Sequence, residues 1–265
     1  MPSRHLNWFA FFAALSLAAG RAPAMECDCA AAGYCTNNAD LADELDRRLR
    51  AHLTAGRRAE EIYQLEGGDS ILRPRSERWA DEHPQAARPE RARLKYRGAG
   101  LPEFFGFSCI DSSVKLAGIC IGADKLGHFF QQGWEGYVIA ERDQRGVEAA
   151  KSYAEWLEGV GERKGYSAKE DYFRRQPSGR IAGYGGFGRN ISGVISHADV
   201  AASCAGTRFY HDVAAGKFKT IRDYVSRDWC EENNRNDYTP AMWKFVRQNT
   251  AGREHPPNTP AQSKP

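Results

Sequence analysis

Leucines recur every fourth residue near the start of the chain and predict its first amphipathic helix. The apolar stripe consists of Leu41, Leu45, Leu49 and Leu53. Charged residues fill the opposite face, as expected for a helix with one face in a core. Asn37 or Asn38 is a suitable N-cap for this helix, and Gly56 is a suitable end. A second helix is expected over residues 57–65, before a glycine pair.

Helical periodicity continues in the second half of the chain. The predicted helices cover residues 123–142, 147–159, 167–175, 196–215, 221–229 and 240–248. The apolar, glycine-containing residues 101–121 are expected to form a buried loop or a short hairpin. We therefore predict a mainly α fold class: a single helical domain with long loops, stapled by disulfides.

Composition divides the chain into segments of different character. Residues 71–100 are rich in Arg, Glu and Pro and predict an extended arm or surface loop, with one short helix around 76–82. The expected organisation is a signal peptide at 1–24, an N-terminal cysteine cluster with helices at 25–70, the charged arm at 71–100, a helical core module at 101–248 and a disordered tail at 249–265.

The first residues have the layout of a secretory signal. Arg4 and His5 precede an apolar stretch, which is followed by Ala22-Pro23-Ala24 as a cleavage site. The apolar stretch is shorter than the roughly 20 residues that a membrane span needs. We expect a periplasmic or secreted protein without a transmembrane span in the mature chain. A component of the cell envelope is then the expected partner. Nucleic acid is not expected because of the export signal, since the net charge of +3 argues neither for nor against it.

Cysteine usage is consistent with export into an oxidising compartment. All seven cysteines follow the proposed cleavage site, namely Cys27, Cys29, Cys35, Cys109, Cys120, Cys204 and Cys230. The simplest arrangement is three disulfides and one free thiol. We expect Cys109 to pair with Cys120, Cys204 to be the free thiol, and the others to pair among themselves. Metal binding by Cys27-x-Cys29 is the alternative, although it lacks the two-residue gap of a zinc knuckle.

A polar stripe on the predicted helix at 123–142 is the strongest functional signal. Asp124, His128, Gln131 and Glu135 share one helical face, and aromatic residues fill the neighbouring faces. Buried polar groups need partners, so three hypotheses follow. Asp124 and His128 bind a divalent metal together with Glu135 or a residue from elsewhere. Alternatively, His128 is a general acid or base, or the stripe is an internal network that fixes helix packing.

A second motif, Ser196-His197-Ala198-Asp199, marks the start of another helix. The spacing predicts that Ser196 is the N-cap and that Asp199 is the N3 residue of a capping-box variant. The small residues that follow predict close packing against a neighbouring helix. The helix with Gly127 and Gly133 is the expected neighbour, and this contact would bring His197 or Asp199 to the polar stripe.

The two motifs together resemble those of uncharacterised exported bacterial proteins. The resemblance rests on Asp124-Lys125-Leu126-Gly127-His128-Phe129 and on Ser196-x-Ala198-Asp199-x-Ala201-Ala202. The Asp-Lys-x-x-His core also resembles VanZ-like membrane proteins, although this chain lacks their membrane spans. The resemblance implies that both motif helices belong to one module at 101–229, but it implies no activity.

Two functions follow from these observations. The first is a hydrolase that acts on a cell-envelope component, with a polar pocket built on Asp124, His128, Glu135 and Asp199. The second is a structural or binding protein in which the same residues stabilise the interior. A glycine-rich segment at 183–188 is expected to be a connector, or a loop over a pocket.

Overall fold

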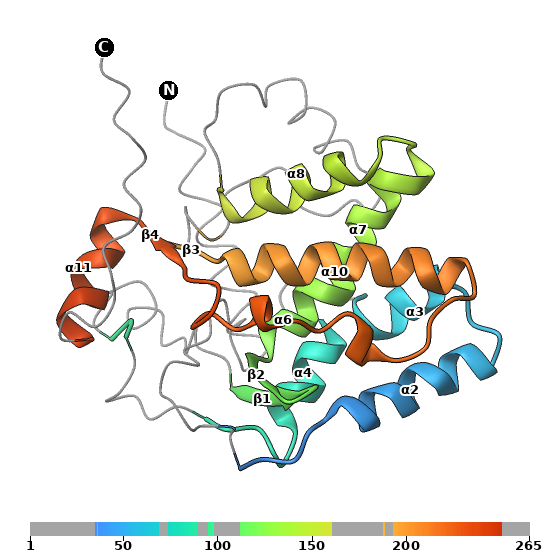
Figure 1. Cartoon of the computed structure of the whole chain (residues 1–265), viewed down its shortest axis with the longest axis horizontal. Coiled ribbons are helices and arrows are strands. Elements are labelled where there is room, and N and C mark those ends of the chain that lie inside the picture. The colour runs from blue at the N-terminus through green and yellow to red at the C-terminus, as the bar shows by residue number, and fades with distance from the viewer. Residues whose placement is uncertain are drawn as a thin grey trace, which may run out of the picture.

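Helices make up most of the described structure (Figure 1), which confirms the predicted mainly α fold class. This computed structural model describes residues 35, 37–68, 74–88, 95–97, 112–160, 188 and 193–250. The predicted signal peptide at 1–24, the helix at 167–175 and the tail beyond residue 250 lie outside these residues. Within the described ranges, no helix has the length and apolar character required to cross a membrane.

The two N-terminal helices form as their sequence patterns predict. Helix α2 spans Ala42–Thr54 and helix α3 spans Ala59–Glu66, and the apolar face of α2 is buried in the main core. Gly56 lies between them with a φ of +71°, a conformation that glycine adopts readily. The start of α2 differs from the prediction, because its first residue comes later than Asn37 or Asn38 would allow.

Asp40 makes the contacts that were expected from those asparagines. Its carboxylate accepts backbone N–H hydrogen bonds from Ala42 at 2.9 Å, from Ala117 at 2.9 Å and from Gly118 at 2.7 Å. Burial by itself would raise the pKa of Asp40, but these donors and Arg222 lower it below its ordinary value. One carboxylate thus connects the start of α2 to a distant turn.

The turn that Asp40 binds belongs to a short antiparallel hairpin. Strand β1 spans Ser113–Leu116 and strand β2 spans Ile119–Gly122, within the segment where a buried loop or hairpin was expected. Cys120 on β2 forms a disulfide with Cys35, across a Cα–Cα distance of 5.8 Å. The predicted Cys109–Cys120 pair is therefore wrong. Proximity along the chain suggested it, but the hairpin lies beside the chain that leads into α2.

The charged segment at 71–100 contains its predicted short helix, α4, which spans Arg75–Glu82. Ser76, Glu77 and Ala80 are buried. The Ser76 hydroxyl donates a hydrogen bond of 3.3 Å to the carbonyl of Leu126. The described part of this segment therefore packs on the helical core instead of extending away from it.

The predicted long helix at 123–142 is continuous, and we call it the central helix. Its parts are α6 (Asp124–Gly127), η2 (His128–Gln132), α7 (Gly133–Tyr137) and η3 (Val138–Arg142). Both η segments are wide π-type turns. Thus the Gly133 N–H bonds to the carbonyl of His128, five residues back, and the Asp143 N–H to that of Val138. Each wide turn holds one more residue than an α-helical turn, which shifts the faces that follow.

Helix α10 (His197–Ala214) packs across the central helix, and α8 (Val147–Glu158) runs beside α10 and also contacts the central helix (Figure 1). Gly206 and Gly133 meet at this crossing. A Cβ atom on Gly206 would lie 1.9 Å from the Phe129 carbonyl oxygen, and one on Gly133 would lie 2.5 Å from the Gly206 Cα. The predicted glycine-mediated contact between the two motif helices is confirmed for Gly133. Gly127 instead faces Glu77 on α4.

The C-terminal part of the described chain packs against the pair formed by α10 and the central helix. It contains η5 (Ile221–Asp223), η6 (Arg227–Trp229), α11 (Pro240–Asn249) and a two-residue pairing of β3 (Val194–Ile195) with β4 (Asp237–Tyr238). Aromatic rings from three regions meet around Phe129 on the central helix. Its ring centroid lies between 4.8 and 6.1 Å from those of Phe130, Phe209, Tyr224 and Trp229.

Candidate metal centre

The two motif helices bring three of the predicted site residues together. Asp124 is the first residue of the central helix, and His128 follows one turn later. Asp199 lies in the first turn of α10, where the Ser196 hydroxyl accepts the Asp199 N–H at 3.2 Å, as the capping motif predicts. Asp124, His128 and Asp199 each offer a ligand atom, and these atoms lie within 4.8 Å of one another. Among them, His128 Nε2 lies 3.3 Å from Asp199 Oδ2.

Lys125 lies at the centre of the carboxylates around this site. Its side chain is fully buried, and its Nζ lies 2.7 Å from Asp124 Oδ2 and 2.5 Å from Asp199 Oδ1. A third contact of 3.2 Å reaches Glu231 Oε1, from the segment after η6. Lys125 therefore acts as an internal counter-ion that joins the two motif helices to the C-terminal part of the chain.

The network continues beyond Lys125 through further buried residues. Glu231 Oε2 lies 3.3 Å from Lys95 Nζ and accepts a 2.9 Å hydrogen bond from the Asn236 amide. The same Asn236 amide bonds to the hydroxyl of Tyr96 at 3.1 Å. Residues 95–97 are thereby attached to the interior by polar contacts.

Glu158, the last residue of α8, approaches the site from the other side. Its side chain is 4% exposed, and its Oε1 lies 3.8 Å from His128 Nδ1. His128 therefore lies between two carboxylates, Glu158 on one ring nitrogen and Asp199 on the other. No hydrogen bond to His128 Nδ1 is present among the described residues.

Carboxylates outnumber ammonium groups in this buried cluster. Among the residues that the structure describes, it contains four carboxylates and two lysines, namely Asp124, Glu158, Asp199, Glu231, Lys95 and Lys125. Burial raises the pKa of Asp124, although Lys125 opposes this effect. Burial, reinforced by Asp199, raises the pKa of Glu158 well above its ordinary value. The surplus negative charge of these six side chains favours the uptake of a proton or a cation.

Glu135, the fourth predicted site residue, lies elsewhere. Its carboxylate accepts a hydrogen bond from the hydroxyl of Tyr153 on α8. In a regular α-helix Glu135 would share a face with Asp124, but the wide turn η2 comes between them. One extra residue in a turn rotates the following residues by about a quarter of a turn. This offset explains why Glu135 is not part of the metal-ligand cluster.

Sequence reasoning assigned no role to several members of the cluster. Lys125 is part of the quoted motif, and a lysine in a helix that is expected to be largely buried could have indicated a buried ion pair. Glu158, Glu231 and Lys95 carry no comparable signal. They belong to other elements, and only the tertiary fold brings them to the site.

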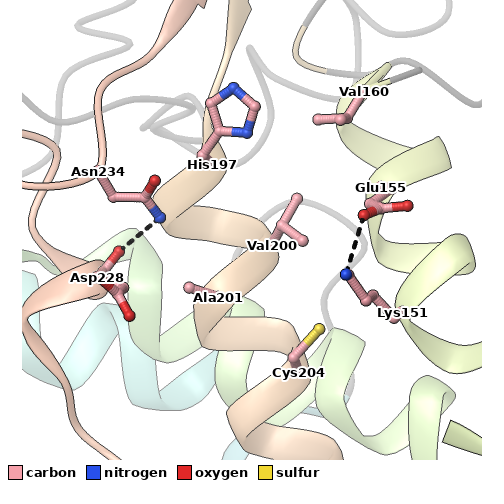
Figure 2. Close-up of a pocket in the computed structure, with 9 residues that line it drawn as sticks. All are labelled: Lys151, Glu155, Val160, His197, Val200, Ala201, Cys204, Asp228 and Asn234. Atoms are coloured by element: carbon pink, nitrogen blue, oxygen red, sulfur yellow. Dashed lines mark hydrogen bonds and ion pairs between the residues drawn. The ribbon is translucent and has the colours of Figure 1, made fainter. Parts of the chain in front are cut away.

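A surface cleft of about 390 Å³ lies between α8 and α10 (Figure 2). His197 borders it and binds Asp237 at 2.9 Å, on the opposite face of α10 from Asp199. His197 is therefore not brought to the polar stripe. Cys204 also lines the cleft and is a free thiol, as predicted, and burial followed by the negative charge of Glu155 raises its pKa.

The donor set of Asp124, His128 and Asp199 suits a divalent cation. Imidazole nitrogen and carboxylate oxygen are normal ligands of zinc and similar ions at about 2.0–2.2 Å, and in a tetrahedral site two such ligand atoms lie about 3.5 Å apart. The ligand atoms of the three groups, which lie within 4.8 Å of one another, therefore need to approach by up to about 1.3 Å to share one ion. Asp199 Oδ1 is buried without a hydrogen bond, although it pairs with Lys125.

Comparison of the chain with models of known protein families, with curated proteins and with solved structures finds no match.

Proposed function

We propose that this protein binds one divalent metal ion through Asp124, His128 and Asp199 and is an exported hydrolase of a cell-envelope component. The observation that carries the proposal is the convergence of these three donors from two helices into a buried cluster with surplus negative charge. When all four carboxyl groups are ionised, Lys95 and Lys125 leave two negative charges among them, which a divalent cation would balance.

The ion would supply the chemistry of hydrolysis. A metal-bound water has a pKa near 7, so hydroxide becomes available as a nucleophile at neutral pH. The residues of this chain hold and orient the ligands. Ser196 fixes the first turn of α10 around Asp199, and Lys125 holds the carboxylates of Asp124 and Asp199 on facing helices.

The alternative is a structural protein without a metal. Lys125 supports it, because one ammonium group already contacts Asp124, Asp199 and Glu231. A satisfied polar network of this kind can specify how helices pack. In that case His128 stabilises the interior and has no role in ligand binding.

Metal analysis separates the two functions. The full-length protein is purified from the periplasm, its metal content is measured, and the chelated protein is titrated with Zn²⁺ or Mn²⁺ by calorimetry. We expect one ion per chain in the wild type. His128→Ala and Asp199→Asn should stay folded and lose binding by at least tenfold, since each removes a ligand.

His197→Ala is the matched control. It removes a histidine from the same turn of α10 as Asp199, but on the other face, so its metal affinity should equal that of the wild type. A wild-type protein without metal affinity, together with a His128→Ala variant that only melts earlier, would favour the structural function. The proposed hydrolase activity is tested by incubating isolated envelope fractions with the metal-loaded wild type or with the Asp199→Asn variant. Soluble products should appear with the wild type alone.

A further inference from the structure

Both ring nitrogens of His128 face acidic side chains, but only one of these carboxylates belongs to the proposed metal centre. Nε2 lies 3.3 Å from Asp199 Oδ2, on the side of the ligand cluster. Nδ1 lies 3.8 Å from Glu158 Oε1 and is buried without a hydrogen bond to any described residue. A buried ring nitrogen without a hydrogen bond is costly, so it favours a partner that can approach.

The fold holds Glu158 firmly in this position. Helix α8 ends at Glu158 because Gly159 adopts a left-handed conformation, with a φ of +75°. Gly188, from the glycine-rich segment noted in the sequence, lies against the Glu158 side chain. A Cβ atom on Gly188 would lie 2.7 Å from Glu158 Oε2 and 2.5 Å from the Val194 carbonyl oxygen. A glycine is therefore needed at residue 188 for the Glu158 carboxyl group to lie where it does.

We infer that Glu158 is the positioning residue for His128: its carboxylate accepts a hydrogen bond from Nδ1–H and leaves Nε2 to bind the metal ion. This inference rests on the proposed metal centre. A shift of about 1 Å turns the 3.8 Å contact into a hydrogen bond. A metal-bound histidine generally donates its other ring N–H to a carboxylate or carbonyl, which fixes the tautomer and the ring orientation.

The inference is tested with variants that separate hydrogen bonding from charge. Glu158→Leu removes both, and Glu158→Gln keeps a carbonyl acceptor in the same place. Glu155→Leu is the matched control, since it removes a carboxylate one turn earlier on α8, where Glu155 pairs only with Lys151 among the contacts described. Zn²⁺ affinity is measured by calorimetry. The His128 tautomer is read from the ¹⁵N shifts of the Zn²⁺-loaded protein, with His128→Ala to assign the signals.

In the wild type we expect a proton on Nδ1 and the metal on Nε2. Glu158→Leu should lose affinity by 10- to 100-fold and no longer show this single tautomer. Glu158→Gln should keep the tautomer and lose less affinity, and Glu155→Leu should match the wild type. Should Glu158→Leu fail to fold, Glu158→Asp replaces it, because a side chain one methylene shorter withdraws the carboxylate from Nδ1.

The inference is overturned if Glu158→Leu, or Glu158→Asp in its place, binds Zn²⁺ within threefold of the wild type and keeps the wild-type tautomer. It is also overturned if the wild type carries the proton on Nε2. A wild type that binds no Zn²⁺ at all contradicts the proposed metal centre itself. The failure of that proposal is therefore distinguishable from the failure of the role assigned to Glu158.

Discussion

Replacing Gly206 with alanine tests how closely the two motif helices must approach. The added methyl group would lie 1.9 Å from the Phe129 carbonyl oxygen, whereas ordinary contacts begin near 3.4 Å. The obstructing atoms belong to the backbone, so no side chain can rotate away, and the helices would have to separate by about 1.5 Å. Overpacking of this kind costs about 3 kcal/mol.

Alanine regains about 1 kcal/mol of helix propensity at the same position. The net loss in the free energy of unfolding is therefore about 2 kcal/mol, which lowers the melting temperature of a protein this size by about 4–8 °C. Thermal and urea unfolding followed by circular dichroism measure this loss. Ala51→Gly, at an exposed position inside α2, calibrates the propensity contribution alone. A Gly206→Ala variant as stable as the wild type, or more stable, would refute the close backbone contact.

Gly133→Ala provides a second test of the same contact. Its methyl group would lie 2.5 Å from the Gly206 Cα, so one separation of the helices relieves both substitutions. The double variant should therefore lose less stability than the sum of the single losses. Additive losses would show that the two glycines act independently. Because Asp199 lies on α10 and His128 on the central helix, each variant should also weaken metal binding.

Three further variants test contacts elsewhere in the fold. Asp40→Asn should cost about 1–2 kcal/mol at pH 7, because hydrogen bonds to charged groups are the stronger kind. Folding lowers the pKa of Asp40, so the Asp40 carboxylate stabilises the fold above about pH 4, and this stabilisation is lost as the pH falls through the folded pKa. The difference in unfolding free energy between variant and wild type should therefore disappear in acid unfolding curves. Cys35→Ser with Cys120→Ser should cost about 4 kcal/mol in urea unfolding, because the bridge spans 85 residues, and an unchanged midpoint would argue against it. Ser196→Ala should cost about 1 kcal/mol by loss of the N-cap, and unaltered thermal unfolding would contradict that role.

The local patterns of the chain predicted most of its described helices. Each of these patterns involves residues within one or two helical turns of each other, so neighbouring residues are enough to predict it. Examples are the leucine spacing of α2, the glycine after α2 and the Ser196 cap. The contact between the two motif helices was also predictable. Close packing of two helices requires small residues on both, and here Gly133 lies on one helix and a run of small residues on the other.

The remaining features depend on contacts between distant segments. Cys120 pairs with Cys35 because the hairpin lies beside the chain that leads into α2, and no spacing rule contains that information. Glu158 and Glu231 reach the candidate site from α8 and from the chain after η6. Glu135 was included because a uniform helical period was assumed, and the wide turn η2 breaks that period.

The wide turn η2 also sets the angle between two halves of one helix. The half before the turn carries Asp124, His128 is the first residue of the turn, and the half after it carries Gly133, which fixes the helix against α10. Deleting one residue within 129–132 would restore a regular helix and rotate one half against the other by about a quarter of a turn. The chain could keep its helix content and its core composition after such a deletion, yet present its ligands in the wrong direction. The length of a single turn would thus set the direction of the proposed metal ligands, independent of the side chains that the turn carries.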